Sequence, residues 1–154
     1  MIEPHAFEDF EVGASFETEV REVSAEDIAA FAEVSGDFNP LHLDDAYAAE
    51  RGYDGRIAHG VLGLAVATGL MNGLGLTRGT LIAFLGLDWS FREPLRPDDA
   101  VRVRLEVAGK RRSSTAGRGI VRLSVTLLNE RGETVQEGEW TMLVRCRGEE
   151  EPAG

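Results

Sequence analysis

The chain has 154 residues, which suits a single domain, since domains most often run to roughly 100–150 residues. Sixteen lysines and arginines stand against 27 aspartates and glutamates, so the formal net charge is −11. This balance argues against nucleic acid as a partner, because nucleic-acid-binding proteins carry a basic surface. The apolar fraction of 43% excludes a disordered acidic chain and predicts a packed core.

The compartment can be predicted from what the chain lacks. Cys146 is the only cysteine, so neither an intramolecular disulfide nor a zinc-finger spacing is available. The start, Met1–His5, has no basic and apolar signal segment. The most apolar run, Val61–Leu76, is shorter than the about 20 residues of a membrane helix. We therefore expect a soluble cytoplasmic protein with no membrane partner, ending in a disordered acidic tail over 149–154.

The first third of the chain predicts a strand and then a helix. Phe7–Val20 ends in alternating apolar and acidic residues, which favour a strand. Ser24 followed three residues later by Asp27 is typical of a helix start, and Gly36 is typical of a helix end. A helix over 25–35 is expected.

Two further helices are expected after a loop. Asn39-Pro40 resists helix, so residues 36–43 should form a loop. Asp44 can then cap a short helix that runs through Glu50. From His59 or Gly60 to about Leu74 the sequence is apolar on every side, which predicts a helix buried all round.

The second half has the period of two that marks strands with one covered face. Leu81–Phe91 is an apolar run, and the segments 101–107, 121–127 and 140–146 alternate between apolar and polar residues. Asn129–Gly132 fits a hairpin loop. The order predicts a single α+β domain over 1–154, in which an antiparallel sheet wraps one buried helix.

Asp37 and His42 are the first candidates for chemistry, because they share one loop that a proline stiffens. An aspartate and a histidine in one pocket can hold a water, so that one group takes a proton and the other returns one. The alternative is that Asp37 only makes a turn while His42 bonds to backbone.

His59-Gly60 opens the expected buried helix. The first N–H groups of a helix have no partner within it, and glycine lets a carbonyl oxygen approach closely, so Gly60 is a candidate oxyanion donor. The alternative is that these residues simply begin the helix.

One local basic run, Lys110-Arg111-Arg112, is a candidate phosphate contact, although such a run in a hairpin loop is more often solvated. Trp89 and Trp140 are expected in the core or an interface. No phosphate loop, nucleophile elbow or histidine-glutamate metal pair occurs, so no metal site is predicted.

Taken together, the motifs resemble one family. Phe31-Ala32-Glu33-Val34-Ser35-Gly36-Asp37-Phe38-Asn39-Pro40-Leu41-His42, followed by Ile57-Ala58-His59-Gly60, resembles the MaoC-like hydratases, the (R)-specific enoyl-CoA hydratase family. The stretch Phe91-Arg92-Glu93-Pro94-Leu95-Arg96-Pro97-Asp98-Asp99 is similar to that family's Phe-x-x-Pro-Val-x-Pro-Gly-Asp segment. The likeness extends over about 7–144. Asp98 replaces the glycine of the family's turn, and aspartate tolerates left-handed backbone better than most residues.

The resemblance implies a hotdog fold and the reversible syn addition of water to a trans-2-enoyl thioester. It implies that Asp37 and His42 are the catalytic pair and that the Gly60 N–H binds the thioester carbonyl, with Asn39, His59 and Thr68 in support. Thr68 stands where the family has a serine. It also implies a homodimer. Fatty acid metabolism is the expected setting, and polyester precursor supply and dicarboxylic acyl-CoA metabolism stay open as pathways.

The substrate carrier is expected to be coenzyme A, with Lys110, Arg111 and Arg112 as candidates for its phosphates and with no separate cofactor. An acyl carrier protein is possible, although an acidic partner would meet an acidic enzyme. Two other functions stay open: a hotdog acyl-CoA thioesterase, and a non-catalytic acyl-thioester binding module.

Overall fold

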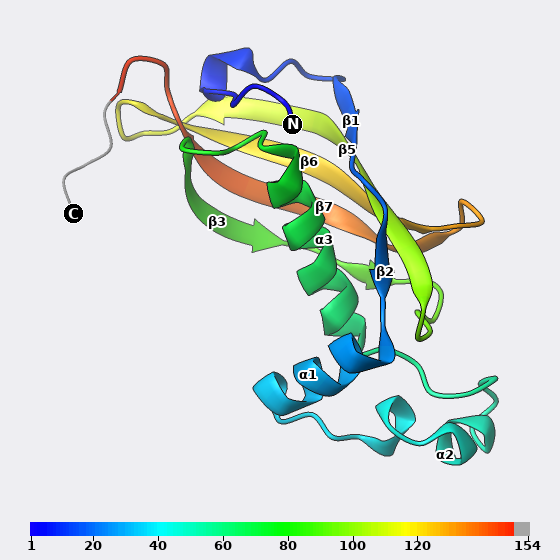
Figure 1. The fold of residues 1–154 in the computed structure, drawn as a ribbon. Helices are drawn as coiled ribbons and strands as arrows, with labels where there is room; N and C mark the ends of the chain where they lie inside the picture. Colours follow the sequence, from blue (N-terminus) through cyan, green and yellow to red (C-terminus); the bar gives the residue numbers. More distant parts are fainter. Residues whose placement is uncertain (150–154) are drawn as a thin grey trace.

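The computed structural model describes residues 1–149 and shows one antiparallel sheet curved around a helix (Figure 1). The tail residues 150–154 lie outside the described part. Glu149, also expected in the disordered tail, is described, and its backbone carbonyl accepts a hydrogen bond from Arg145.

The sheet has seven strands, and five of them follow one another in the order β1-β5-β6-β7-β3. The two short strands β2 and β4 lie off this path: β2 pairs with β5, next to β1, and β4 pairs with β7, next to β3. All pairs are antiparallel. The strands are β1 (Ser15–Glu17), β2 (Arg21–Val23), β3 (Leu81–Leu87), β4 (Ser90–Phe91), β5 (Asp99–Arg112), β6 (Arg118–Asn129) and β7 (Thr134–Arg145).

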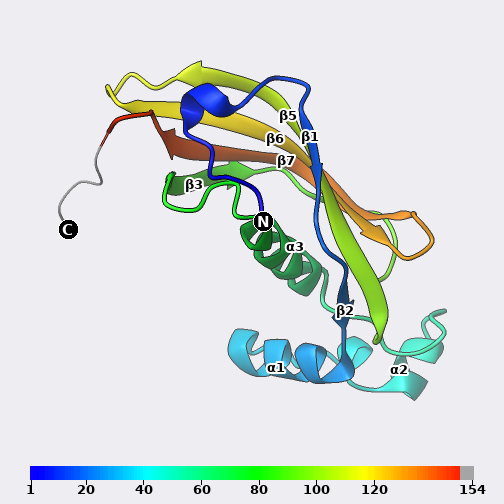
Figure 2. The same ribbon diagram turned by 45° about the horizontal axis from the view of Figure 1, so that its top comes forward.

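Helix α3 (Gly60–Leu74) lies along the concave face of the sheet (Figure 2). Helices α1 (Ala25–Ser35) and α2 (Asp45–Ala49) gather at the end of the sheet where β2 meets the start of β5. Two 3-10 turns, η1 (Phe7–Asp9) and η2 (Pro40–His42), complete the elements. The main core cluster joins apolar residues of α3 to the inner face of β5, β6 and β7. The α+β architecture is as predicted.

The helix boundaries follow from local chemistry. In α1, the Ser24 hydroxyl accepts from the Asp27 N–H, the Asp27 carboxylate accepts from the Ser24 N–H, and Gly36 ends the helix at φ 76°. In α2, the Asp44 carboxylate accepts from the Tyr47 N–H. These helix starts were predicted from the sequence and are confirmed.

Several sequence predictions were wrong in detail. The segment Phe7–Val20 contains only one short strand, β1, after the turn η1, and Val20 is exposed. The run Leu81–Phe91 divides into β3 and β4, because Asp88 and Trp89 turn the chain: the Asp88 carboxylate and backbone bond to Glu139.

The prediction that α3 is buried all round was also wrong for the single chain. Leu62, Gly63, Val66, Ala67 and Met71 are buried against the core. A second face is exposed, because the sheet curves around only part of the helix. No helix within residues 1–149 is long and apolar enough to cross a membrane.

The turn before β5 shows how one substitution in the family pattern is accommodated. Asp98 has φ 71°, the only positive φ at a non-glycine position in the described part of the chain. Its N–H donates to the Val23 carbonyl at 2.6 Å, and the Asp99 carboxylate accepts from the Arg96 N–H at 2.9 Å. The left-handed turn therefore survives without glycine, as expected.

Candidate active site

The loop between α1 and α2 shapes one side of the candidate site. Asp37 follows the glycine that ends α1, and its carboxylate accepts a hydrogen bond from the Asn39 N–H at 3.1 Å. The Asn39 side chain accepts from the Leu41 N–H at 3.0 Å and begins η2, which carries His42. Asn39 thus shapes the loop that carries Asp37 and His42, and the 3-10 turn that begins at Pro40 was not foreseen.

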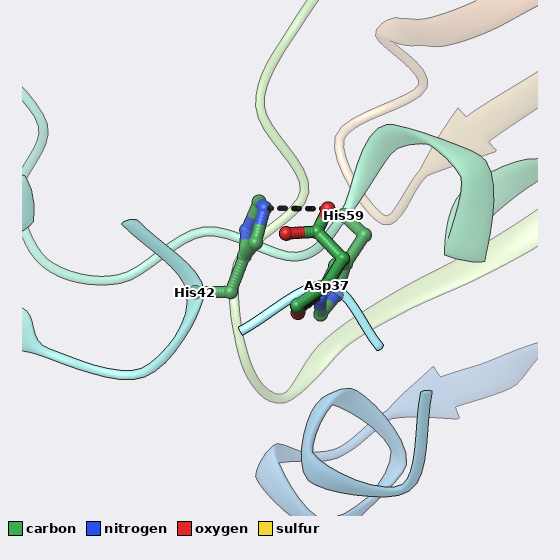
Figure 3. A group of neighbouring side chains, drawn as sticks. All are labelled: Asp37, His42 and His59. Carbon is green, nitrogen blue, oxygen red and sulfur yellow. Dashed lines mark hydrogen bonds and ion pairs between the residues drawn. The ribbon is translucent and has the colours of Figure 1, made fainter. Parts of the chain in front are cut away.

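Asp37, His42 and His59 come together at the start of α3 (Figure 3). The His42 Nε2 atom lies 3.8 Å from the Asp37 carboxylate. The Asp37 side chain is 52% exposed, whereas that of His42 is only 12% exposed. A distance of 3.8 Å is too long for a hydrogen bond, but it leaves both atoms able to hold the same water.

The hydrogen bond on the other side of the His42 ring fixes its tautomer. Nδ1 lies 2.8 Å from the Ile57 carbonyl oxygen, which can only accept, so Nδ1 carries the proton. In the neutral ring, Nε2 then presents a lone pair toward Asp37. A histidine held in this way is oriented as a general base.

His59 contacts both Asp37 and His42. Its Nε2–H donates to the backbone carbonyl of Asp37 at 2.9 Å, so the histidine that precedes α3 anchors the residue that follows α1. Its ring stacks on His42 with centroids 3.8 Å apart and an interplanar angle of 28°. Phe31 of α1 packs edge-on against the same ring at 4.9 Å. These contacts give the predicted supporting residue a physical role.

Asp37, His42 and His59 each place one potential metal-ligand atom within 4.8 Å of the others. A metal must lie in the plane of every imidazole that binds it, at about 2.0–2.1 Å from nitrogen for zinc. The His42 and His59 rings are stacked nearly parallel, so their planes do not meet near both nitrogens. The His59 Nε2 atom already donates to Asp37. The arrangement suits a water better than a metal.

Gly60 is the first residue of α3, and its N–H has no acceptor among residues 1–149. A cavity of about 270 Å³ adjoins it, lined by Tyr53, Ile57, Ala58, Gly60, Phe91, Arg92, Glu93, Pro94, Leu95 and Gln136. A Cβ atom at Gly60 would lie 2.7 Å from the Phe91 ring, so a larger residue would require that ring to move. A larger cavity, about 880 Å³, lies elsewhere, between α3 and the β1–β2 edge.

Two groups of predicted residues lie away from this cluster. The Thr68 hydroxyl is exposed two turns further along α3 and donates to the Ala65 carbonyl at 2.6 Å. Lys110, Arg111 and Arg112 form the last residues of β5, not a hairpin loop, and lie at the far end of that strand from the site (Figure 1).

The basic run is engaged with the N-terminal segment of the chain. Lys110 donates to the backbone carbonyls of Phe7 and Glu8 at 3.1 and 3.3 Å. Arg112 pairs with the Glu8 carboxylate at 3.6 Å. Within one chain, the structure therefore does not bring these three residues to Asp37 and His42.

Gln136 was not predicted as a site residue. It is the only glutamine in the chain. It lies on β7, is 2% exposed, and contacts the Gly60 carbonyl at the start of α3. A signal was present, because the period of two in β7 places Gln136 on the same face as Trp140, Met142 and Val144. A polar side chain on an otherwise apolar face needs a partner.

Comparisons with known proteins show which family the chain resembles. The family model of the MaoC like domain matches residues 9–128. The 3-hydroxybutyryl-CoA dehydratase of Methylorubrum extorquens is 39% identical over 66% of this chain, which spans 63% of that protein's length. The (R)-specific enoyl-CoA hydratase of Aeromonas caviae is 34% identical over 75% of this chain and 81% of that protein.

Solved structures of MaoC-like and hotdog proteins are also similar to this chain. The MaoC-like dehydratase from Rhodospirillum rubrum is 31% identical, with a TM-score of 0.83 over 94% of this chain and 99% of that chain. A Mycobacterium tuberculosis protein described as a double hotdog fold has a TM-score of 0.84 at 24% identity, over 97% of this chain and 47% of that chain. The hotdog fold is thus confirmed, and the chain belongs to the MaoC-like dehydratase family.

Proposed function

We propose that this protein catalyses the reversible, (R)-specific hydration of a trans-2-enoyl-CoA to a 3-hydroxyacyl-CoA. The observation that carries the proposal is the approach of the Asp37 carboxylate to the His42 Nε2 atom, 3.8 Å apart, at the helix end that presents Gly60. The relatives named (R)-specific enoyl-CoA hydratase and 3-hydroxybutyryl-CoA dehydratase support the reaction class.

The pair can deliver both parts of water to one face of the double bond. A water between the groups donates one O–H to Asp37 and the other to His42. As the water oxygen bonds to C3, either Asp37 or His42 accepts one of the water protons. The pair then gives one proton to C2. The product gains OH at C3 and H at C2, and the pair returns to its starting protonation state. Positioned acid–base groups of this kind contribute about 10²–10⁴-fold.

Gly60 supplies the complementary electrostatic contribution. Negative charge grows on the thioester oxygen as water adds to C3, and a fixed N–H at that oxygen binds the transition state more strongly than the substrate. Such a donor is typically worth about 3–4 kcal/mol. The thioester carbonyl can occupy the cavity of about 270 Å³ beside Gly60.

Several finer points belong to the same proposal. The reaction requires no metal or separate cofactor, since proton transfer and one N–H suffice, and coenzyme A enters only as part of the substrate. An acyl carrier protein as the carrier, a cytoplasmic location and a role in fatty acid metabolism stay predictions from the sequence.

A homodimer is also part of the proposal. Strand β3 pairs with β7 on one side only, and within residues 1–149 no strand covers its other edge. This edge strand contains no charged residue, and its large apolar side chains are exposed: Leu81, Ile82, Phe84, Leu85 and Leu87. A second copy of the chain can cover such an edge by antiparallel pairing, because unprotected apolar edges associate.

The loss of enoyl absorbance with crotonyl-CoA, followed by chiral analysis of the product, tests the function. Asp37→Asn should lower kcat by about 10²–10⁴-fold, because a neutral amide can neither accept nor return a proton as part of the pair. Glu33→Gln, which removes a charge from the exposed side of α1, is the matched control and should leave kcat unchanged. Wild-type activity in Asp37→Asn would refute the assignment. Release of free thiol faster than hydration would favour the thioesterase, and ligand binding without turnover would favour the binding module.

A further inference from the structure

The start of α3 is held by a buried side chain that takes no part in the proton transfers. The Gln136 Nε2–H donates to the Gly60 carbonyl at 3.0 Å, and its Oε1 accepts from the Trp89 indole N–H at 2.8 Å. Both ends of this 2% exposed amide are therefore satisfied, and its orientation is fixed. The indole donor defines which end is oxygen, so the NH₂ must face Gly60.

The surroundings are shaped to admit this amide. Gly63 lies one turn further along α3, and a Cβ atom there would lie 2.3 Å from the Gln136 Nε2 atom. Phe91 is the strand partner of Gln136 in the β4–β7 pair. Its ring fills the space where a side chain at Gly60 would be. Two glycines thus give space to one glutamine and one phenylalanine.

Gly60 needs such support because glycine has no side chain to restrict its backbone. The peptide bond that carries its N–H lies between two anchors. Before it, His59 is tied to the Asp37 carbonyl at 2.9 Å, and after it, the Gly60 carbonyl is tied to Gln136 at 3.0 Å. The catalytic loop and the carbonyl-binding N–H are held in one hydrogen-bonded chain.

We infer that Gln136, oriented by Trp89, is a positioning residue that aims the Gly60 N–H at the thioester carbonyl. This inference rests on the proposed function, since it assigns a task to the same site. A fixed donor loses little energy to reorganisation when charge develops, and a misplacement of about 1 Å can cost about 10²-fold in rate.

Gln136→Met tests the inference, because methionine has a similar length but cannot make either hydrogen bond. Its kcat should fall about 10- to 100-fold while KM changes less than about threefold, since the apolar contacts to substrate remain. Trp89→Phe removes only the hydrogen bond to Oε1 and should give a smaller loss. Val135→Ala is the matched control, because Val135 is the buried neighbour of Gln136 on β7 and its side chain makes neither of these hydrogen bonds.

A spectroscopic measurement separates positioning from general destabilisation. A cinnamoyl-CoA with an electron-donating ring substituent absorbs at longer wavelength when its carbonyl is polarised by a hydrogen bond. The wild type should shift this band to the red, and Gln136→Met should bind the probe with a reduced shift, while Val135→Ala keeps the full shift.

An unchanged kcat and red shift in Gln136→Met would overturn the inference, as would equal losses in Val135→Ala. The proposed function fails differently, because the wild type would then hydrate no enoyl-CoA. The band shift of the bound probe would still report on Gln136 in that case.

Discussion

At the scale of single residues, His59 and Asp37 illustrate how a backbone contact can matter as much as a side-chain contact. The His59 ring donates to the Asp37 backbone carbonyl, not to its carboxylate, so it fixes the position of the proposed catalytic residue without competing for the proton. Its stacking on His42 fixes the second member of the pair as well.

His59→Phe should therefore lower kcat about 10- to 100-fold, less than Asp37→Asn, because the ring stacking is kept and only the hydrogen bond to Asp37 is lost. His59→Gln, which can still donate to the Asp37 carbonyl, should recover part of the rate. Steady-state kinetics with crotonyl-CoA would measure both. A full-rate His59→Phe enzyme would show that the contact is structural only.

At the scale of elements, the start of α1 shows how a helix boundary becomes dependent on pH. The pKa of the Asp27 carboxyl is lowered, chiefly by the hydrogen bond from the Ser24 backbone N–H, with Arg21 nearby adding to the effect. A carboxyl whose pKa is lowered by folding adds stability above its unfolded pKa. That stability is lost as the pH falls through the folded value.

Asp27→Asn should cost about 1 kcal/mol at pH 7, because the capping box and its charge are weakened. Below about pH 4 the difference from the wild type should shrink, since the wild-type carboxyl is protonated there as well. Urea unfolding at several pH values would measure this. Glu26→Gln, in the same helical turn, is the control. A difference that stays constant down to pH 2 would contradict the role of Asp27.

At the scale of the whole molecule, two exposed surfaces carry no charge. Neither the edge strand β3 nor helix α3 contains a charged residue, although the net charge of the chain is −11. The acidic residues therefore lie elsewhere, and only a limited surface lacks electrostatic protection against self-association.

Leu85→Lys should shift the protein from dimer to monomer in sedimentation velocity, because a charge on the β3 edge opposes strand pairing. Leu85 is 50% exposed in the single chain, so the substitution does not disturb the core. Val34→Lys adds the same charge at an 85% exposed site on α1 and should leave the dimer intact. A wild type that sediments as a monomer would end the dimer proposal.

The sequence by itself determined the elements whose causes are local. The capping box of Ser24 and Asp27, the glycine after α1 and the aspartate before α2 act within one helical turn, so the spacing predicted these helices well. The Asp37–His42 pair was found for the same reason, because one short loop brings the two residues together. Alternation along β5, β6 and β7 likewise followed from the strand period.

Only the tertiary structure decided which distant residues meet. The contact of Gln136 with Gly60 joins residues 76 positions apart, and no local period encodes it. The breaks at Thr18–Val20 and Asp88-Trp89, and the open face of α3, depend on how far the sheet curves. Lys110–Arg112 were expected near a ligand because charge suggests phosphate. The fold sets them against Phe7 and Glu8, since pairing of long strands places the two ends of β5 far apart.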